Sequence, residues 1–182
     1  MSIVVATADT PKDIESALRL RYEVFTVEAS DTRYANHVTR TYSDPTDTQR
    51  AKIVIARDGG TTVGTLRLTF RADGPFIADA LYRFPLILCE PVTHPGANLT
   101  AIALVDRVVV HRSCRGRGIL PRMLEHAVEL ARARGCTYMV MAVAAASARM
   151  QSILDVRGWF SYHVSDPANG WTGRHFYQRI GR

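Results

Sequence analysis

The stretch from residue 101 to residue 134 constrains the fold more than any other part of the chain. Residues 101–111 form an apolar, β-branched run that is interrupted once by Asp106-Arg107, and this run predicts a buried strand. A basic turn with two glycines follows, and residues 118–134 then repeat apolar side chains at helical spacing. A buried strand that leads directly into an amphipathic helix indicates a layered domain, in which helices cover a sheet.

Shorter patterns predict the remaining elements. In the first half, a helix is expected over 12–27, strands over 51–57 and 62–71 joined by a hairpin at Asp58-Gly59-Gly60, and a loop over 28–50. Four prolines mark residues 72–99 as a long connection with one helical turn near 78–84. The second half adds a strand over 137–144, a helix over 147–157 and strands near 159–164 and 174–180. The pattern predicts one α+β (mixed α/β) domain over residues 1–182.

Composition excludes several classes of protein. Apolar residues make up 47% of the 182 residues and charged residues 22%, which is typical of a globular domain. No apolar run reaches the roughly 20 residues that span a bilayer, and the N-terminus lacks the basic region of a secretory signal. The three cysteines are dispersed and the histidines lack metal-ligand spacing. We therefore expect a cytoplasmic protein without a metal site, disulfide frame or membrane segment.

The basic charge is carried almost entirely by arginine. The formal net charge is +6, and 21 of the 23 basic residues are arginine, the exceptions being Lys12 and Lys52. Arginine forms two-pronged hydrogen bonds to phosphate and carboxylate groups, so a phosphate-bearing or acidic partner fits this composition. Codon bias in a GC-rich genome explains the same excess, and net charge alone does not separate the two.

The turn before the long helix is the strongest functional signal. It reads Arg115-Gly116-Arg117-Gly118-Ile119-Leu120. The first N–H groups of a helix lack partners inside the helix and carry the positive end of its dipole, so this turn predicts a phosphate or pyrophosphate site. Neither the triphosphate-binding P-loop nor the dinucleotide-binding glycine motif is present. The alternative is a solvated basic turn that binds nothing.

This turn, following Val110, resembles the acyl-coenzyme A signature of the GNAT superfamily of N-acetyltransferases. That signature reads Gln/Arg-x-x-Gly-x-Gly/Ala after a strand, and Leu120 replaces its last small residue. The resemblance covers residues 101–160 and includes Gly158-Trp159. It implies an acyl-CoA N-acyltransferase (GNAT-like) fold, with a central mixed, mostly antiparallel sheet flanked by helices. It also implies a donor, acetyl-CoA or a longer acyl-CoA, whose pantetheine contacts Val108, Val109 and Val110, and whose pyrophosphate lies over Arg115, Gly116, Arg117, Gly118, Ile119 and Leu120.

The first half resembles the acyl-homoserine lactone synthases and N-acyl amino acid synthases. The matching pieces are Arg21-x-x-Val24-Phe25, Asp44-x-x-Asp47, Gly64-Thr65-Leu66-Arg67-Leu68, Phe84 and Arg107. The family tryptophan near Asp31 is absent, and Leu104 stands where a glutamate is expected. This resemblance implies acceptor contacts at Arg21, Phe25, Arg67 and Arg107, and it offers an acidic acyl carrier protein as the alternative donor.

These patterns together predict transfer of an acetyl or acyl group to the amine of a small molecule, an amino acid being one such acceptor. Asp106 is the candidate base because a carboxylate interrupts an apolar strand there, although a structural ion pair with Arg67 or Arg107 explains it equally. A thiol nucleophile at Cys114 beside His111 is a further alternative. A non-catalytic sensor or nucleic-acid-binding regulator is the alternative of another class, and no helix-turn-helix pattern favours it.

Overall fold

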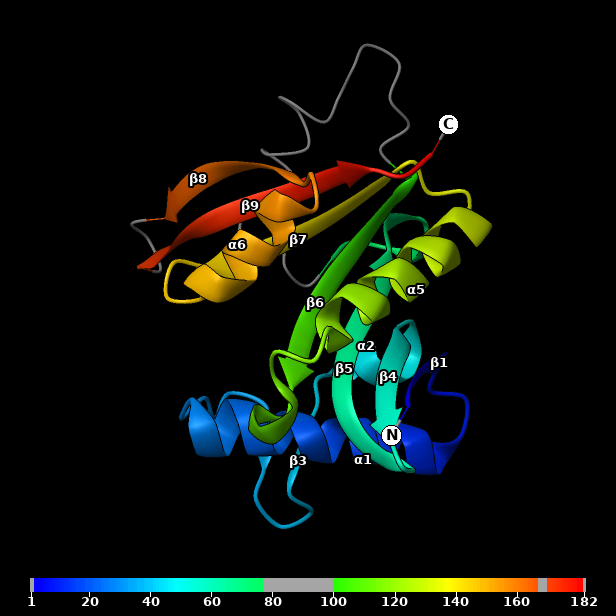
Figure 1. Ribbon diagram of the computed structural model, residues 1–182, viewed down its shortest axis with the longest axis vertical. Helices are drawn as coiled ribbons and strands as arrows, with labels where there is room; N and C mark the ends of the chain where they lie inside the picture. The colour runs from blue at the N-terminus through cyan, green and yellow to red at the C-terminus, as the bar shows by residue number, and fades with distance from the viewer. Residues whose placement is uncertain (1, 77–99, 167–169, 182) are drawn as a thin grey trace. The chain divides into compact units, whose positions relative to one another are not determined.

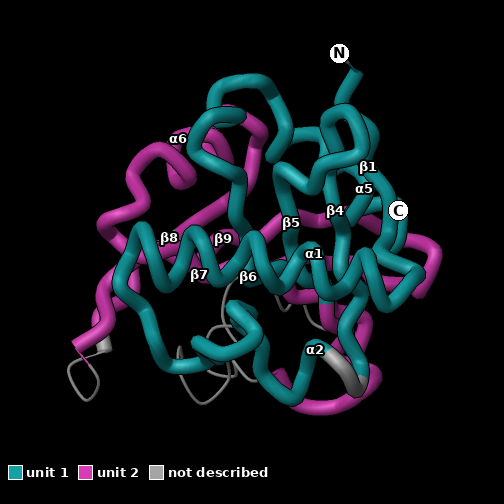
Figure 2. Tube along the Cα trace, turned by 90° about the horizontal axis from the view of Figure 1, so that it is seen from below, with its two compact units in different colours: residues 1–68, 105–130 teal, residues 69–104, 131–182 magenta. Residues whose placement is uncertain are grey.

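A computed structural model describes residues 2–76, 100–166 and 170–181 (Figure 1). The chain divides into two compact units (Figure 2). Unit 1 consists of Met1–Leu68 and Val105–Leu130, and unit 2 consists of Thr69–Leu104 and Ala131–Arg182. No helix in the described ranges has the length and apolar character needed to cross a membrane.

Unit 1 is a sheet with a helix on it. Its strand order is β1 (Ile3–Thr7), β4 (Lys52–Asp58), β5 (Thr61–Phe70) and β6 (Ile102–Val110), and the β1–β4 and β4–β5 pairs are antiparallel. The predicted hairpin is confirmed, because Gly59 and Gly60 adopt φ values of 57° and 88° between β4 and β5. Helix α1 (Pro11–Arg21) begins at the N-cap Thr10 and packs Ala17 against Ile53 and Ile55.

A close approach joins β5 to helix α5 (Ile119–Ala133) within unit 1. A Cβ atom at Gly64 would lie 2.9 Å from Cγ2 of Ile119 and 3.1 Å from the sulfur of Met123. Only glycine leaves the first turn of α5 this near to the strand. Gly135, with φ of 73°, follows the helix as the sequence predicts.

The region between α1 and β4 is more ordered than the predicted loop. A π-helix, η1 (Tyr22–Glu28), continues α1, and β2 (Ala35–Asn36) pairs with β3 (Thr41–Tyr42). Helix α2 (Pro45–Gln49) follows, and Asp44 and Asp47 form a reciprocal capping box at its start. The loop prediction over 28–50 was therefore wrong for β2, β3 and α2, whereas α1 and η1 together fill the helix predicted over 12–27. Strand β1, which is five residues long, was also not predicted.

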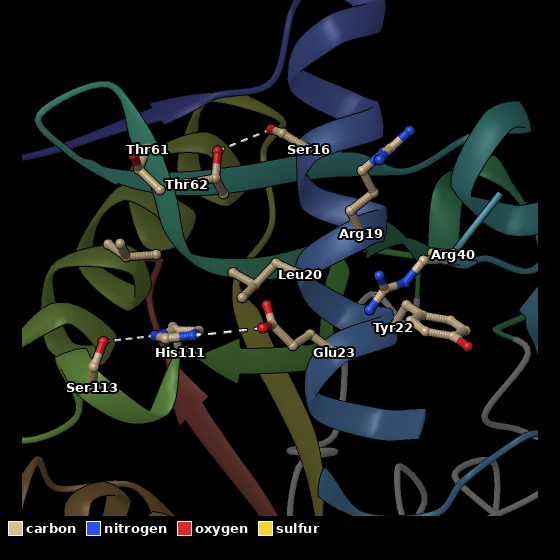
Figure 3. Close-up of a pocket in the computed structure, with 11 residues that line it drawn as sticks. Ser16, Arg19, Leu20, Tyr22, Glu23, Arg40, Thr61, Thr62, His111 and Ser113 are labelled. Atoms are coloured by element: carbon tan, nitrogen blue, oxygen red, sulfur yellow. Dashed lines mark hydrogen bonds and ion pairs between the residues drawn. The ribbon is translucent and has the colours of Figure 1, made fainter. Parts of the chain in front are cut away.

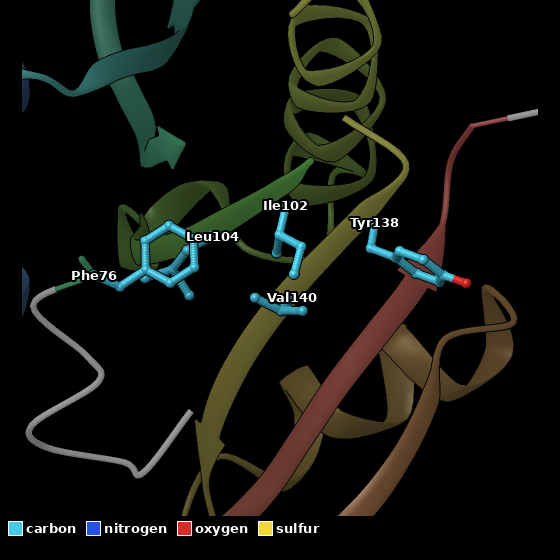
Figure 4. Close-up of a cluster of buried hydrophobic side chains, with 5 residues drawn as sticks. All are labelled: Phe76, Ile102, Leu104, Tyr138 and Val140. Carbon is cyan, nitrogen blue, oxygen red and sulfur yellow. The ribbon is translucent and has the colours of Figure 1, made fainter. Parts of the chain in front are cut away.

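Unit 2 holds the rest of the predicted second half. Strand β9 (Trp171–Arg179) pairs antiparallel with β7 (Tyr138–Ala144) and β8 (Phe160–Asp166), and α6 (Ala148–Val156) connects β7 to β8. The first residues of β6, Ile102–Leu104, pair parallel with β7. The side chains of Ile102 and Leu104 form a buried cluster with Tyr138, Val140 and Phe76 (Figure 4).

The second-half prediction is confirmed element by element, and the mixed, mostly antiparallel sheet agrees with the expected fold class. The helical turn predicted near residues 78–84, and Phe84 with it, lies outside the described residues.

Candidate active site

The basic turn lies between β6 and α5, as predicted. After β6 ends at Val110, a short 3-10 helix, η3 (Arg112–Cys114), leads to Gly116 and Gly118 with φ values of 86° and 71°. Both glycines occupy the left-handed region, which other residues adopt only under strain. A Cβ atom at Gly118 would meet nothing within 4 Å, so the space beside the turn is open.

The amides at the start of α5 are available to a ligand. Ile119 and Leu120 open the helix, so their N–H groups have no acceptor inside it, and Pro121 has no N–H group. In the part of the chain that the structure describes, no side chain accepts a hydrogen bond from either amide. The side chains of both residues are buried, with 2% and 7% exposure. The turn therefore presents backbone donors to an anion.

The two arginines of the turn are held by carboxylates. The Nε atom of Arg115 donates to the carbonyl oxygen of Val110 at 3.0 Å, and its second nitrogen donates to Glu28 at 2.5 Å. Arg117 donates to Asp58 at 2.7 Å. These guanidinium groups are about 40% exposed, whereas the side chains of Glu28 and Asp58 are 24% and 12% exposed. The two arginines therefore stay partly open to solvent, while the carboxylates that hold them are largely covered.

A buried network of ion pairs lies elsewhere in unit 1. Arg67 is fully buried and donates to Asp44 at 2.7 Å and to both oxygens of Asp106, each at 2.7 Å. Arg21 is also fully buried and donates to Asp47 at 2.6 Å. Arg107 donates to the second oxygen of Asp44 at 2.8 Å. Three guanidinium groups and three carboxylates thus neutralise one another.

The pKa values follow from burial and from these partners. Burial alone would raise the pKa of Asp44, but hydrogen bonds from Arg67 and Arg107 lower it to about 2. Burial lowers the pKa of Arg21, and this effect is larger than the opposing effect of Asp47, which raises it. Burial alone would lower the pKa of Arg67, but the hydrogen bonds and charge of Asp106, together with Asp44 and Asp47, raise it. Asp44 and Arg67 are therefore charged at neutral pH.

Asp106 forms an ion pair with Arg67, one of the two structural pairings that the sequence predicts for it. Its side chain is 21% exposed, so it touches solvent while both oxygens accept from Arg67. The next residue, Arg107, has φ of 50° in the middle of β6, and its guanidinium lies 4.7 Å from the ring centre of Tyr34. A non-glycine residue in this region costs about 1–3 kcal/mol, which the contacts of Arg107 offset.

The candidate acceptor residues differ in exposure. Arg21 and Arg67 have no exposed side-chain surface, and their charges are already matched by aspartates. Arg107 is 12% exposed, and Phe25 packs on Tyr42 with ring centres 4.9 Å apart. The sequence did not reveal the rings of Tyr34 and Tyr42 over Arg107, because no local pattern links residues so far apart.

The structure favours no thiol–imidazole pair at Cys114. The Nδ1 atom of His111 lies 2.7 Å from Oγ of Ser113, and that hydroxyl lies 3.6 Å from the sulfur of Cys114. The thiol also accepts from Arg117 at 3.7 Å. Among residues 2–76, 100–166 and 170–181, no group of three His, Cys, Asp or Glu side chains could hold a metal ion.

The structure resembles several solved acyltransferases. An acetyltransferase of the GNAT family from Staphylococcus aureus Mu50 is 9% identical, with 99% of this chain and 100% of that chain covered and a TM-score of 0.66. The CoA-dependent acyl-homoserine lactone synthase BjaI, solved with SAM and isopentyl-CoA, is 18% identical, with 99% and 83% covered and a TM-score of 0.70. FeeM, an N-acyl amino acid synthase from uncultured soil microbes, is 12% identical, with 98% and 91% covered and a TM-score of 0.68.

At these identities the likeness shows a shared fold. No curated protein matches the sequence. The sequence profile described as "Acetyltransferase (GNAT) family" matches residues 14–158, which is most of the chain and includes both β6 and the basic turn. With that match and the shared fold, this chain belongs to the GNAT family of acetyltransferases.

Proposed function

We propose that the protein transfers an acetyl or longer acyl group from acyl-CoA to the amine of a small molecule. The observation that supports this donor best is the open turn at Gly118, where the first amides of α5 lack protein acceptors. Family membership supports the reaction class, and the turn lies where the family signature occurs in the sequence.

The donor would follow the strand and the turn. Its diphosphate would accept hydrogen bonds from the amides at the start of α5, with Arg115 and Arg117 exchanging their carboxylate partners for phosphate oxygens. Its pantetheine arm would run along the backbone of Val108–Val110 in β6, the segment that leads directly to the turn. Such contacts hold the thioester in place for attack.

The acyl transfer needs one proton acceptor. The amine nitrogen attacks the thioester carbon, the new C–N bond forms as the C–S bond breaks, and the coenzyme leaves as a thiolate that takes up a proton. Asp106 is the proposed base, acting on the amine directly or through one water, because its carboxylate is partly exposed on β6 one residue away from the strained Arg107. A neutral amine is then available for attack.

A substitution in the turn tests the donor site. Gly118→Asp places a carboxylate where the phosphates are expected, and we expect acetyl-CoA to bind at least tenfold more weakly than to Gly118→Asn, because the two side chains have the same shape and differ in charge. Isothermal titration calorimetry with acetyl-CoA and with a longer acyl-CoA measures this difference.

The matched control is Gly135→Asp. Gly135 has φ of 73° and open space at its Cβ position, like Gly118, but it follows the other end of α5. We expect this variant to bind acetyl-CoA as the natural chain does. Equal, tight binding by Gly118→Asp would refute the placement of the phosphates, and absence of binding to the natural chain would refute the donor.

A further inference from the structure

Unit 1 contains a cavity of about 500 Å³ that the donor site does not use (Figure 3). Its walls come from α1, from the first turn of η1, from the start of β5 and from the residues that follow β6. Leu20 and Val63 give it apolar surface, and hydroxyl groups of serine and threonine line the wall at Ser16 and Thr62. Cavities of this size hold small molecules.

Two exposed charged side chains line this cavity; among the residues that the structure describes, one has no ion pair and the other faces only a histidine. Arg40 lies over the ring of Tyr22 at 5.9 Å, and its guanidinium has no carboxylate partner within the described part of the chain. Glu23 is 53% exposed and points toward His111, with 3.8 Å between its Oε1 atom and Nε2, beyond hydrogen-bond distance. Arg19, by contrast, is paired with Glu15 at 2.8 Å.

The backbone holds Arg40 in an unfavourable conformation. Its φ of 53° lies in the left-handed region, which costs a non-glycine residue about 1–3 kcal/mol. This conformation occurs in the connection between β2 and β3, next to the cavity wall. Strain of this kind often marks residues that contact a ligand.

From this arrangement we propose that the cavity binds a small amino carboxylic acid. Its carboxylate forms a two-pronged hydrogen bond with Arg40, its ammonium group binds Glu23, and its side chain packs on Leu20 and Val63. A phosphate dianion fits less well, because the Glu23 carboxylate repels it. A neutral ligand would form neither of these two charged contacts. The proposal concerns binding alone and does not depend on the donor site.

Ligand analogues test the proposal on the natural chain. The ¹⁵N-labelled protein is titrated with each proteinogenic L-amino acid, and we expect at least one to shift the amide signals of Leu20, Thr62 and Val63 with saturation. The primary amide of that amino acid lacks the carboxylate, and its N-acetyl derivative lacks the ammonium group. We expect each derivative to bind about tenfold to a hundredfold more weakly. No saturable shift with any amino acid, or equal binding of the amide, would overturn the proposal.

Variants then assign each charge to its partner. Arg40→Met should weaken binding of the amino acid about tenfold to a hundredfold and leave binding of the primary amide unchanged. Glu23→Gln should weaken binding of the amino acid and leave binding of its N-acetyl derivative unchanged. The control is Arg149→Met, the same change at an exposed arginine of α6 in unit 2. Equal losses for all ligands, or no loss, would refute these contacts; if a variant does not fold, the analogue series on the natural chain decides.

A last measurement distinguishes two roles for the bound amino acid, acyl acceptor and regulator. Incubation with acetyl-CoA and the bound amino acid, followed by mass spectrometry, shows whether its nitrogen is acetylated. Acetylation identifies the ligand as the acceptor, and binding without acetylation identifies it as a regulator. In either case the binding site stands, and failure of the donor assay leaves the titration result intact.

Discussion

Arg67 is the residue on which the buried ion-pair network depends most. One guanidinium group, fully buried, lies within 2.7 Å of oxygens on Asp44 and Asp106 and within 3.4 Å of an oxygen of Asp47. Replacing it in Arg67→Met keeps a long apolar chain but removes both hydrogen bonds to Asp106, and it leaves Asp44 with Arg107 as its remaining ion-pair partner. Removing one partner of a buried ion pair costs about 3–5 kcal/mol.

This loss should depend on pH. The pKa of Asp44 is about 2 in the folded protein against an ordinary value of 3.8, so the folded state binds its proton more weakly than the unfolded state. The resulting stabilisation is fully present above pH 4 and is lost as the pH falls from 3.8 to about 2. A difference of nearly two pKa units corresponds to about 2 kcal/mol.

Urea unfolding of Arg67→Met and of the natural chain at pH 7 and at pH 3, followed by circular dichroism, measures both quantities. We expect the variant to lose about 3–5 kcal/mol at pH 7, or about 6–20 °C in melting temperature for a chain of this length. We also expect its stability to change less than that of the natural chain between the two pH values. Arg149→Met, at an exposed site, serves as the control. A loss below about 1 kcal/mol at pH 7 would refute the reasoning.

Three further predictions follow from single contacts. Asp106→Asn should lower kcat at least tenfold with little change in KM and remove the acidic limb of the pH–rate profile; an unchanged profile would exclude it as the base. Gly64→Ala should cost about 1–3 kcal/mol in urea unfolding, because its Cβ atom would lie 2.9 Å from Ile119, and a neutral effect would contradict that approach. Burial lowers the pKa of His175 to about 4, so the free energy of unfolding should fall by about 3 kcal/mol as the pH drops from 6.5 to 4. His175→Phe should remove this dependence, and equal pH dependence in both proteins would contradict the prediction.

Local patterns were sufficient for much of the chain. The helical period of α5 ends at Gly135, and the Gly59-Gly60 turn joins β4 to β5, because each of these signals operates within a few residues. The same holds for the turn at Gly118, where the strand before it and the helix after it both have strong patterns of their own. These elements place the glycine turn between β6 and α5, as the sequence predicts.

The region from residue 28 to residue 50 could not be predicted in this way. Helix α2 is only five residues long, too short to form from propensity alone. Its N-cap Asp44 is fixed instead by Arg67 and Arg107, which lie 23 and 63 residues further along the chain. Only the capping box was visible in the sequence, as an Asp-Pro-Thr-Asp run at residues 44–47. Long-range ion pairs leave no periodic signal that a sequence can show.

The structure also changes how the basic composition is interpreted. Arg21 and Arg67 are buried and Arg107 is largely so, and their charges are cancelled by three aspartates of the same network. These arginines therefore cannot attract a nucleic acid or an acidic protein, although they count toward the arginine excess. Arg115 and Arg117 differ from them, because their side chains are 42% and 39% exposed. The positive charge that stays partly exposed is thus local to the turn before α5, where Arg115 and Arg117 closely precede the first backbone amides of the helix.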